Sequence, residues 1–270
     1  MCTTGMLRLA VGDYLLFKNK DFGRTHFDDR LVTEAGVFGV RGVSTWAGTD
    51  PDLDEFSGFS IGANEHGLLC CDSNVRTIEG HANYDELTEI ALREGRDVGS
   101  AVAAVGQAVE SRPYLWANLI MIDQADAAAV EVRGDRIEAT DLAAPTARSN
   151  HHVELKPHPG DDDTVTTERR LASAQHRLER ADRIDDIFEL QRSHDDGDTG
   201  ICNHHLYRTV YSYVLRHKGH TTALHVAQGQ PCADPERVEL TVPLGKQWSP
   251  DSAARFRASY PSAYATLQDR

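Results

Sequence analysis

The second residue of the chain, Cys2, carries the functional groups of a catalytic nucleophile. Methionine is normally removed when a small residue follows it, so we expect the mature chain to begin with Cys2. An N-terminal cysteine offers a thiol nucleophile and an α-amino group with a pKa of about 7.7–8.0, which can act as the base near neutral pH. Many chains have an accidental cysteine after the start, so Cys2 alone does not specify this chemistry.

A carboxylate follows at a position from which it could assist Cys2. Residues Cys2–Ala10 and Tyr14–Asn19 are predicted to form a β-hairpin around the turn sequence Val11-Gly12-Asp13. Asp21 lies just beyond the second strand, which runs beside the first, so its side chain can reach the amino group and orient it. The alternative is that Asp21 is a turn carboxylate at the end of a strand.

Further short motifs follow Cys2 in order along residues 2–240. They are Lys18-Asn19-Lys20-Asp21-Phe22, Asn64-Glu-His-Gly-Leu68 with Asn74, Ser149-Asn150-His151, Thr166-Thr-Glu-Arg-Arg-Leu-Ala172, and Ile201-Cys202-Asn203-His204 with Gly229-Gln-Pro-Cys232. The series resembles the choloylglycine hydrolase and penicillin V acylase family. It resembles still more the acyl-coenzyme A:6-aminopenicillanic acid acyltransferase family of the same N-terminal-nucleophile hydrolase superfamily. Each motif is weak alone, but five in this order after a position-2 cysteine are fairly specific.

The resemblance implies catalytic roles for five residues. Cys2 would be the nucleophile, with Asp21 orienting its amino group. Asn74 and Asn150 would supply hydrogen-bond donors to the oxyanion of the tetrahedral intermediate, where one donor is worth roughly 10²–10³ in rate. Arg170 would take the position of the family's active-site arginine. We assign no catalytic role to the remaining motif residues, Cys202, His204 and Cys232, which we expect to pack near the site.

Aromatic side chains near these motifs are predicted to contact the substrate. The acidic stretch Val43–Phe59 lies between two predicted strands and would form a rim over an apolar pocket, with the exit of the first hairpin as the opposite wall. The alternative is a solvated loop with a few anchoring aromatic residues. Lys18 stands where bile-salt hydrolases carry arginine, which puts bile-salt recognition in doubt. The predicted substrate contacts are Lys18, Phe22, Phe27, Trp46, Phe56 and Phe59.

The cysteine and histidine spacing gives no reason to expect a metal site or a cofactor. Five cysteines without regular spacing argue against a disulfide framework, and no CxxC pair occurs. The adjacent pairs His151-His152 and His204-His205 would point to opposite faces if they lay on strands. The sequence likewise contains neither a GxGxxG motif nor a P-loop, so a nucleotide-binding function lacks support.

The charge of the chain limits the kinds of partner that we expect. The formal net charge is −14 and the sequence pI is about 5.3, the opposite of what a phosphate-binding surface needs, so we expect no nucleic-acid partner. Five lysines stand against 23 arginines, and aspartate is abundant, which suggests adaptation to high salt. Without a long apolar run or a signal peptide, we expect a cytoplasmic protein that is not inserted in a membrane. A homo-oligomer is compatible with the sequence.

The predicted elements run as strands, helices, strands and helices, which favours antiparallel sheets covered by helices. Beyond the first hairpin we expect strands at Val37–Val43, Ser57–Gly62, Gly67–Asp72, Leu115–Ile122, Ala128–Val132, Arg136–Ala139, Thr209–Arg216 and Thr221–Ala227. Helices are expected at Tyr84–Glu94, Val98–Glu110, Thr167–Arg180 with Thr166 or Thr167 as its cap, Ile184–Gln191, and from Pro250 onward. The resemblance implies an α+β fold, the four-layer αββα sandwich, as a single domain over residues 1–270.

Three functions are compatible with these residues. The first is hydrolysis of a linear, non-peptide amide through an acyl-enzyme on Cys2. The second is transfer of the same acyl group to an acceptor amine. The third is a non-enzymatic binding or chaperone function on the same fold, which would not need Cys2, Asp21, Asn150 and Arg170 together. In the first two cases the partner is a small-molecule acyl amide.

Overall fold

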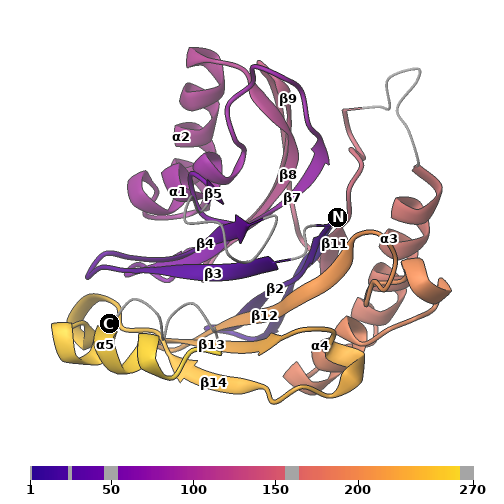
Figure 1. The fold of residues 1–270 in the computed structure, drawn as a ribbon. Coiled ribbons are helices and arrows are strands. Elements are labelled where there is room, and N and C mark those ends of the chain that lie inside the picture. Colours follow the sequence, from indigo (N-terminus) through magenta and orange to yellow (C-terminus); the bar gives the residue numbers. More distant parts are fainter. Residues whose placement is uncertain (1, 24–25, 46–53, 156–163, 262–270) are drawn as a thin grey trace.

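The computed structural model describes residues 2–23, 26–45, 54–155 and 164–261, whose strands form two antiparallel sheets (Figure 1). In sheet A the strand order is β11 (Thr146–Arg148), β1 (Cys2–Ala10), β2 (Asp13–Phe22), β12 (Arg208–Lys218), β13 (Thr221–Gln228) and β14 (Val238–Thr241). In sheet B it is β10 (Arg136–Asp141), β9 (Ala127–Gly134), β8 (Tyr114–Ile122), β7 (Leu69–Arg76), β6 (Ile61–Asn64), β4 (Val37–Thr45) and β3 (His26–Thr33), with β5 (Asp54–Glu55) also paired to β4.

Three apolar cores separate four layers. One core lies between the sheets and includes Leu16 of sheet A and Phe38 of sheet B. A second joins sheet B to α1 (Asp85–Glu94) and α2 (Val98–Ser111), and a third joins sheet A to α3 (Thr164–Leu178) and α4 (Ile184–Gln191). Helix α5 (Pro250–Ala258) adds Phe256 to the core between the sheets. Helices α1 to α4 therefore cover the outer faces of the two sheets (Figure 1), and the predicted αββα sandwich is confirmed.

Strand β2 shows how successive side chains of one strand pack on both faces of sheet A. Successive side chains of a strand point to opposite faces. Leu16 accordingly lies in the core between the sheets, whereas Leu15 and Phe17 pack toward α3 and α4. Because both faces are covered, the strand reads as an almost continuous buried run rather than an alternating one. The same alternation sends Lys18 toward sheet B and Asn19 toward the helices, where it donates to the backbone oxygens of Gln191 and Ile201.

The first hairpin is confirmed, with Val11 and Gly12 in the turn and Gly12 at a φ of 72°, which glycine adopts without strain. Four strands were not predicted, namely β3, β5, β11 and β14. Short 3-10 helices are present at η1 (Gly197–Thr199), η2 (Pro231–Ala233) and η3 (Gly245–Gln247). The predicted cap of α3 is wrong, because the helix already begins at Thr164 and Thr167 lies inside it.

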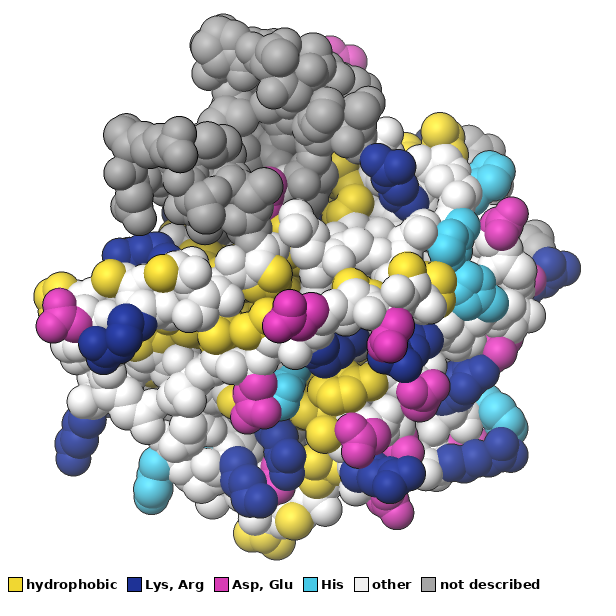
Figure 2. Space-filling view, turned by 60° about the horizontal axis from the view of Figure 1, so that its bottom comes forward, with side chains coloured by type: hydrophobic (Ala, Val, Ile, Leu, Met, Phe, Trp, Pro, Cys, Tyr) yellow, Lys and Arg dark blue, Asp and Glu magenta, His cyan; other side chains and the backbone are white. Residues whose placement is uncertain are grey.

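Acidic and basic side chains are interspersed over the face shown in Figure 2, rather than gathered into a single basic area. Several charged side chains of the described residues are paired, as in Arg216 with Asp13 at 2.6 Å and Arg93 with Glu34 at 2.8 Å. Among the described residues, no helix is both long enough and apolar enough to cross a membrane.

Candidate active site

Strand pairing brings Asn150 to Cys2. Strand β11 pairs with β1 in the register Thr4 to Arg148, which continues to place Asn150 opposite Cys2. The Cys2 backbone nitrogen donates to Asn150 Oδ1 at 2.8 Å, and Cys2 itself is buried. This nitrogen occupies the position of the α-amino group of a chain that begins with Cys2.

The loop that carries Asn150 is held from sheet B. The Ser149 carbonyl oxygen accepts hydrogen bonds from Ser73 Oγ at 2.8 Å and from Asn118 Nδ2 at 2.9 Å. Asn118 Nδ2 also donates to the His151 carbonyl at 3.0 Å. Because Ser73 lies on β7 and Asn118 on β8, these bonds fix the Asn150 loop between the two sheets, at the end where β1 begins.

Arg170 joins Cys2 to Asn150. This arginine lies on α3 and is fully buried. One guanidinium nitrogen donates to the Cys2 carbonyl oxygen at 2.9 Å, and the other donates to Asn150 Oδ1 at 2.9 Å. A planar guanidinium is suited to such a two-pronged contact, which a lysine could not reproduce. Arg170 therefore fixes the backbone of Cys2 and the side chain of Asn150 in one arrangement.

Asp21 lies at the end of β2, in a buried polar environment. Thr209 Oγ1 donates to one of its carboxylate oxygens at 2.7 Å, and Asn203 Nδ2 donates to the other at 3.4 Å. Burial raises the pKa of Asp21 to about 6, although the positive charges of the N-terminal amino group and of Arg170 act in the opposite direction. Asn203 belongs to a motif noted in the sequence and Thr209 begins a predicted strand, but the link of both residues to Asp21 was not predicted.

We expect Asp21→Asn to change the pH dependence of both stability and activity. An unfolded aspartate has a pKa of about 3.9, so between about pH 4 and pH 6 the folded chain binds a proton that the unfolded chain does not. The ionisation of Asp21 therefore lowers the free energy of unfolding by up to about 3 kcal/mol as pH rises through this window. The amide hydrolysis expected from the sequence should show the opposite trend and fall below about pH 6, because the charged carboxylate of Asp21 is lost there.

Urea denaturation and kcat/KM profiles of both proteins across this pH range measure these effects. In Asp21→Asn the stability difference from the wild type should shrink toward low pH, and the acid limb of kcat/KM should disappear. Parallel stability curves, or an unchanged acid limb, would show that Asp21 does not titrate here.

Asn74 lies at an irregularity in sheet B. The register between β7 and β8 shifts between Asn74 and Arg76, and such bulges redirect backbone groups. The Asn74 carbonyl oxygen accepts a hydrogen bond from Asn150 Nδ2. The structure thus brings Asn74 into contact with Asn150, whose Oδ1 holds the Cys2 nitrogen, and the part of Asn74 in an oxyanion hole stays a prediction.

Lys18 belongs to a buried charge network beside Cys2. Its Nζ donates to Asp72 Oδ1 at 2.8 Å and to the Ser60 carbonyl at 2.9 Å, and its side chain is only 2% exposed. Burial disfavours the charged form of Lys18, but the negative charge of Asp72 outweighs the effect of burial, so the pKa of Lys18 is raised. Burial and the charge of Asp72 also raise the pKa of Asp85. Sequence reasoning missed both aspartates, and contact of Lys18 with a substrate stays a prediction.

Only part of the predicted aromatic rim lies where we expected it. The rings of Phe22 and Phe56 are in contact, with centroids 5.5 Å apart, so the two predicted walls meet. Trp46 and the side chain of Phe27 lie outside the described residues. The prediction for Phe59 is wrong, because its ring is fully buried in the core between sheet B and α1.

The matched substitutions Phe59→Ala and Phe56→Ala separate packing from substrate contact. Phe59→Ala should lower the free energy of unfolding by about 3–5 kcal/mol and leave kcat/KM for an acyl amide unchanged. Phe56→Ala removes a half-buried ring, so it should cost less stability but lower kcat/KM. Urea denaturation and steady-state kinetics of both variants measure these effects. A loss of kcat/KM in Phe59→Ala but not in Phe56→Ala would show that Phe59 contacts the substrate.

Comparison of the whole chain with solved structures finds this architecture in known enzymes. Penicillin V acylase from Agrobacterium tumefaciens superposes with a TM-score of 0.54 at 12% identity, covering 89% of this chain and 86% of that chain. A variant of conjugated bile acid hydrolase from Clostridium perfringens gives 0.53 at 12% identity, covering 84% and 89%. The chain has the N-terminal-nucleophile hydrolase fold.

A third structure with this fold comes from an animal. The N-acylethanolamine-hydrolyzing acid amidase ortholog of Caenorhabditis elegans gives a TM-score of 0.50 at 15% identity, covering 96% of this chain and 98% of that chain. No family model and no curated protein matches the sequence. The structural neighbours are amide-hydrolysing enzymes, and at these identities they establish the N-terminal-nucleophile hydrolase fold.

Proposed function

We propose that this protein is an amidohydrolase that cleaves a linear, non-peptide amide through an acyl-enzyme on Cys2. The observation that carries the proposal is the arrangement of Asn150 and Arg170 around Cys2. Asn150 Oδ1 accepts from the Cys2 nitrogen at 2.8 Å, and Arg170 donates both to that oxygen and to the Cys2 carbonyl, each at 2.9 Å. A purely packing role would not need a fully buried arginine to hold the first residue of a mature chain.

The proposed reaction follows from these groups. Once Met1 is removed, the Cys2 nitrogen is an amine whose lone pair can take the thiol proton, and Sγ then attacks the amide carbon. As the C–N bond breaks, the protonated amine returns that proton to the leaving nitrogen. Water then attacks the thioester carbon and gives one proton to the amine. As the C–S bond breaks, the protonated amine returns that proton to Sγ, which releases the free acid and restores the Cys2 thiol.

Asn150 supplies two functions in this scheme. Its Oδ1 holds the Cys2 nitrogen, and its amide group has two N–H donors. One donor goes to the Asn74 carbonyl, and we assign the other to the oxyanion that forms when Sγ attacks. Asp21, held by Thr209 and Asn203, would balance the positive charge that the amine acquires.

An assay with a panel of N-acyl amides tests the proposal, because it detects both the released amine and the free acid. High salt should be included, since the composition suggests a salt-adapted chain. Addition of a second amine distinguishes hydrolysis from acyl transfer, because transfer through the same acyl-enzyme would produce a new amide. Absence of any product from an N-terminally processed, folded protein would favour the non-enzymatic binding function instead.

The Phe22 and Phe56 contact supports an apolar or aromatic acyl group as the part of the substrate that the protein binds. Each buried methylene contributes about 0.8 kcal/mol, so kcat/KM should rise roughly fourfold per added methylene until the pocket is full. A chain-length series of acyl amides measures this slope, and Phe56→Ala should flatten it. A flat series in the wild type would exclude an apolar acyl site.

A further inference from the structure

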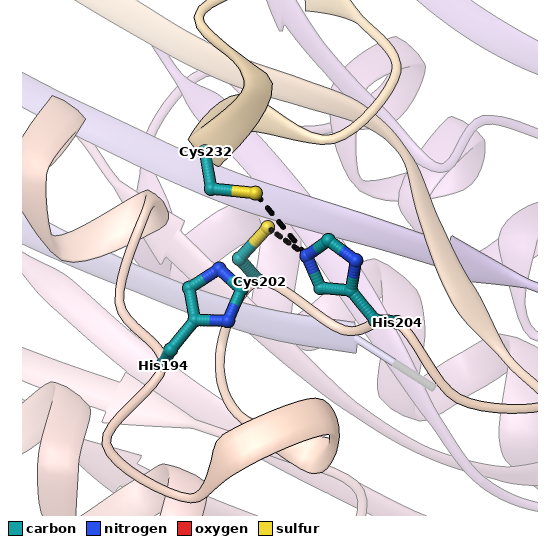
Figure 3. A group of neighbouring side chains, drawn as sticks. All are labelled: His194, Cys202, His204 and Cys232. Atoms are coloured by element: carbon teal, nitrogen blue, oxygen red, sulfur yellow. Dashed lines mark hydrogen bonds between the residues drawn. The ribbon is translucent and has the colours of Figure 1, made fainter.

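Four side chains from three separate segments meet near the candidate active site. His194 follows α4, Cys202 and His204 lie between η1 and β12, and Cys232 lies in η2. One potential ligand atom from each lies within 4.8 Å of all the others. Figure 3 shows the two sulfur atoms and the imidazole rings turned toward a common centre.

The distances within this cluster are close to those of a zinc coordination sphere. His204 Nε2 lies 3.5 Å from Cys202 Sγ and 3.1 Å from Cys232 Sγ. The ring centroids of His194 and His204 are 4.7 Å apart. Tetrahedral zinc with Zn–S of about 2.3 Å and Zn–N of about 2.0–2.1 Å holds neighbouring ligand atoms roughly 3.3–3.8 Å apart. A shift of about 1 Å in the longest separations would complete the tetrahedron.

We propose that His194, Cys202, His204 and Cys232 bind one zinc ion in a closed structural site. Two thiolates and two imidazoles in a tetrahedral arrangement are typical ligands of zinc. Binding would release the proton of each thiol, because the thiolate is the ligand form. Cys202 is buried, whereas His194 and Cys232 lie at the surface, so an ion can enter from solvent. From the sequence we expected no metal, because the cysteines have no regular spacing and adjacent histidines would point to opposite faces of a strand.

The site would fix the loop that supports Asp21. Asn203, which donates to the Asp21 carboxylate, lies between the two ligands Cys202 and His204. The Cys202 backbone nitrogen also donates to the Ser193 carbonyl, next to His194. Zinc would therefore join the end of α4, the Asn203 loop and η2 in one cross-link behind the candidate active site. This role is structural and does not depend on the proposed amidase activity.

Metal analysis of the full-length protein, expressed with zinc and then dialysed, tests the site. We expect about one zinc per chain in the wild type and in His205→Ala, and its loss in His204→Ala and Cys232→Ser. His205 is a matched control, since it neighbours His204 but lies outside the cluster. Cobalt loaded in place of zinc should show the intense visible absorption of a tetrahedral thiolate site, and a zinc chelator should lower the Tm of the wild type and not of His204→Ala.

Three results would overturn the proposal. The first is a folded wild type without zinc that also fails to bind cobalt. The second is full zinc content in His204→Ala. The third is a wild-type intact mass lower by two hydrogens, mapped to a disulfide between Cys202 and Cys232. Because the readouts are metal content, spectrum and mass, they remain interpretable even if no amide substrate is found.

Discussion

Cys2→Ala is expected to lower amide hydrolysis by roughly 10⁴-fold or more, because it removes the atom that would form the acyl-enzyme. The hydrolytic activity of Cys2→Ser should also be strongly impaired, since a hydroxyl is a weaker nucleophile than a thiol near neutral pH. The fold should persist, because the contacts of Cys2 with Asn150 and Arg170 are made by its backbone. Steady-state kinetics with the best amide of the panel measure the loss of activity, and the Tm of each variant shows whether the fold persists.

Cys70→Ala is the matched control for this prediction. Cys70 is also a fully buried free thiol, but it lies in the core between sheet B and its helices. The Cys70→Ala variant should be less stable than the wild type but should keep kcat within a few-fold of the wild-type value. Retention of activity in Cys2→Ala, or an equal loss in Cys70→Ala, would remove Cys2 from the reaction.

Asn150→Ala should lower kcat by roughly 10²–10³, the effect of removing one oxyanion donor. The substitution also removes the acceptor that holds the Cys2 nitrogen and leaves the buried Arg170 guanidinium without one partner. KM should change less than kcat, because the donor acts when the oxyanion forms. The measurement is kcat and KM for a single amide in the purified variant.

Asn64→Ala provides the comparison for Asn150. Asn64 is a buried asparagine, whereas Asn150 is half-buried, and Asn64 Nδ2 donates to the carbonyl oxygens of Leu92 and Gly95 between sheet B and α1. Its removal should lower stability and leave kcat near the wild-type value. If both variants lose activity in proportion to stability, the role of Asn150 is structural.

The sequence predicted the positions around Cys2 better than the pocket. The hairpin of β1 and β2 was readable from its turn, and ordered motifs pointed to Asn150 and Arg170, which the structure brings to Cys2. Phe59 was misplaced because it was assigned to the rim together with the rest of the acidic stretch Val43–Phe59, whereas it lies just before β6 and packs into the core between sheet B and α1. The edge strand β14, with alternating exposed residues, was missed for lack of an apolar run.

The metal cluster could not be predicted for a different reason. Its ligands come from loops after α4, before β12 and in η2, separated by up to 38 residues between His194 and Cys232. Their convergence depends on the pairing of β12 with β13 and on the packing of α4 against sheet A. The motif around Cys202 and His204 was recognised, but only the tertiary fold supplies His194 and explains why Asn203 lies beside Asp21.

The most direct test of the central claim is the mass of the enzyme while it turns over. Wild-type protein mixed with a reactive acyl amide and quenched in acid should give an intact mass that lacks Met1 and carries one acyl group. Peptide mapping should place that group on Cys2. An active preparation that retains Met1, or an acyl group found on a different residue, would contradict the account.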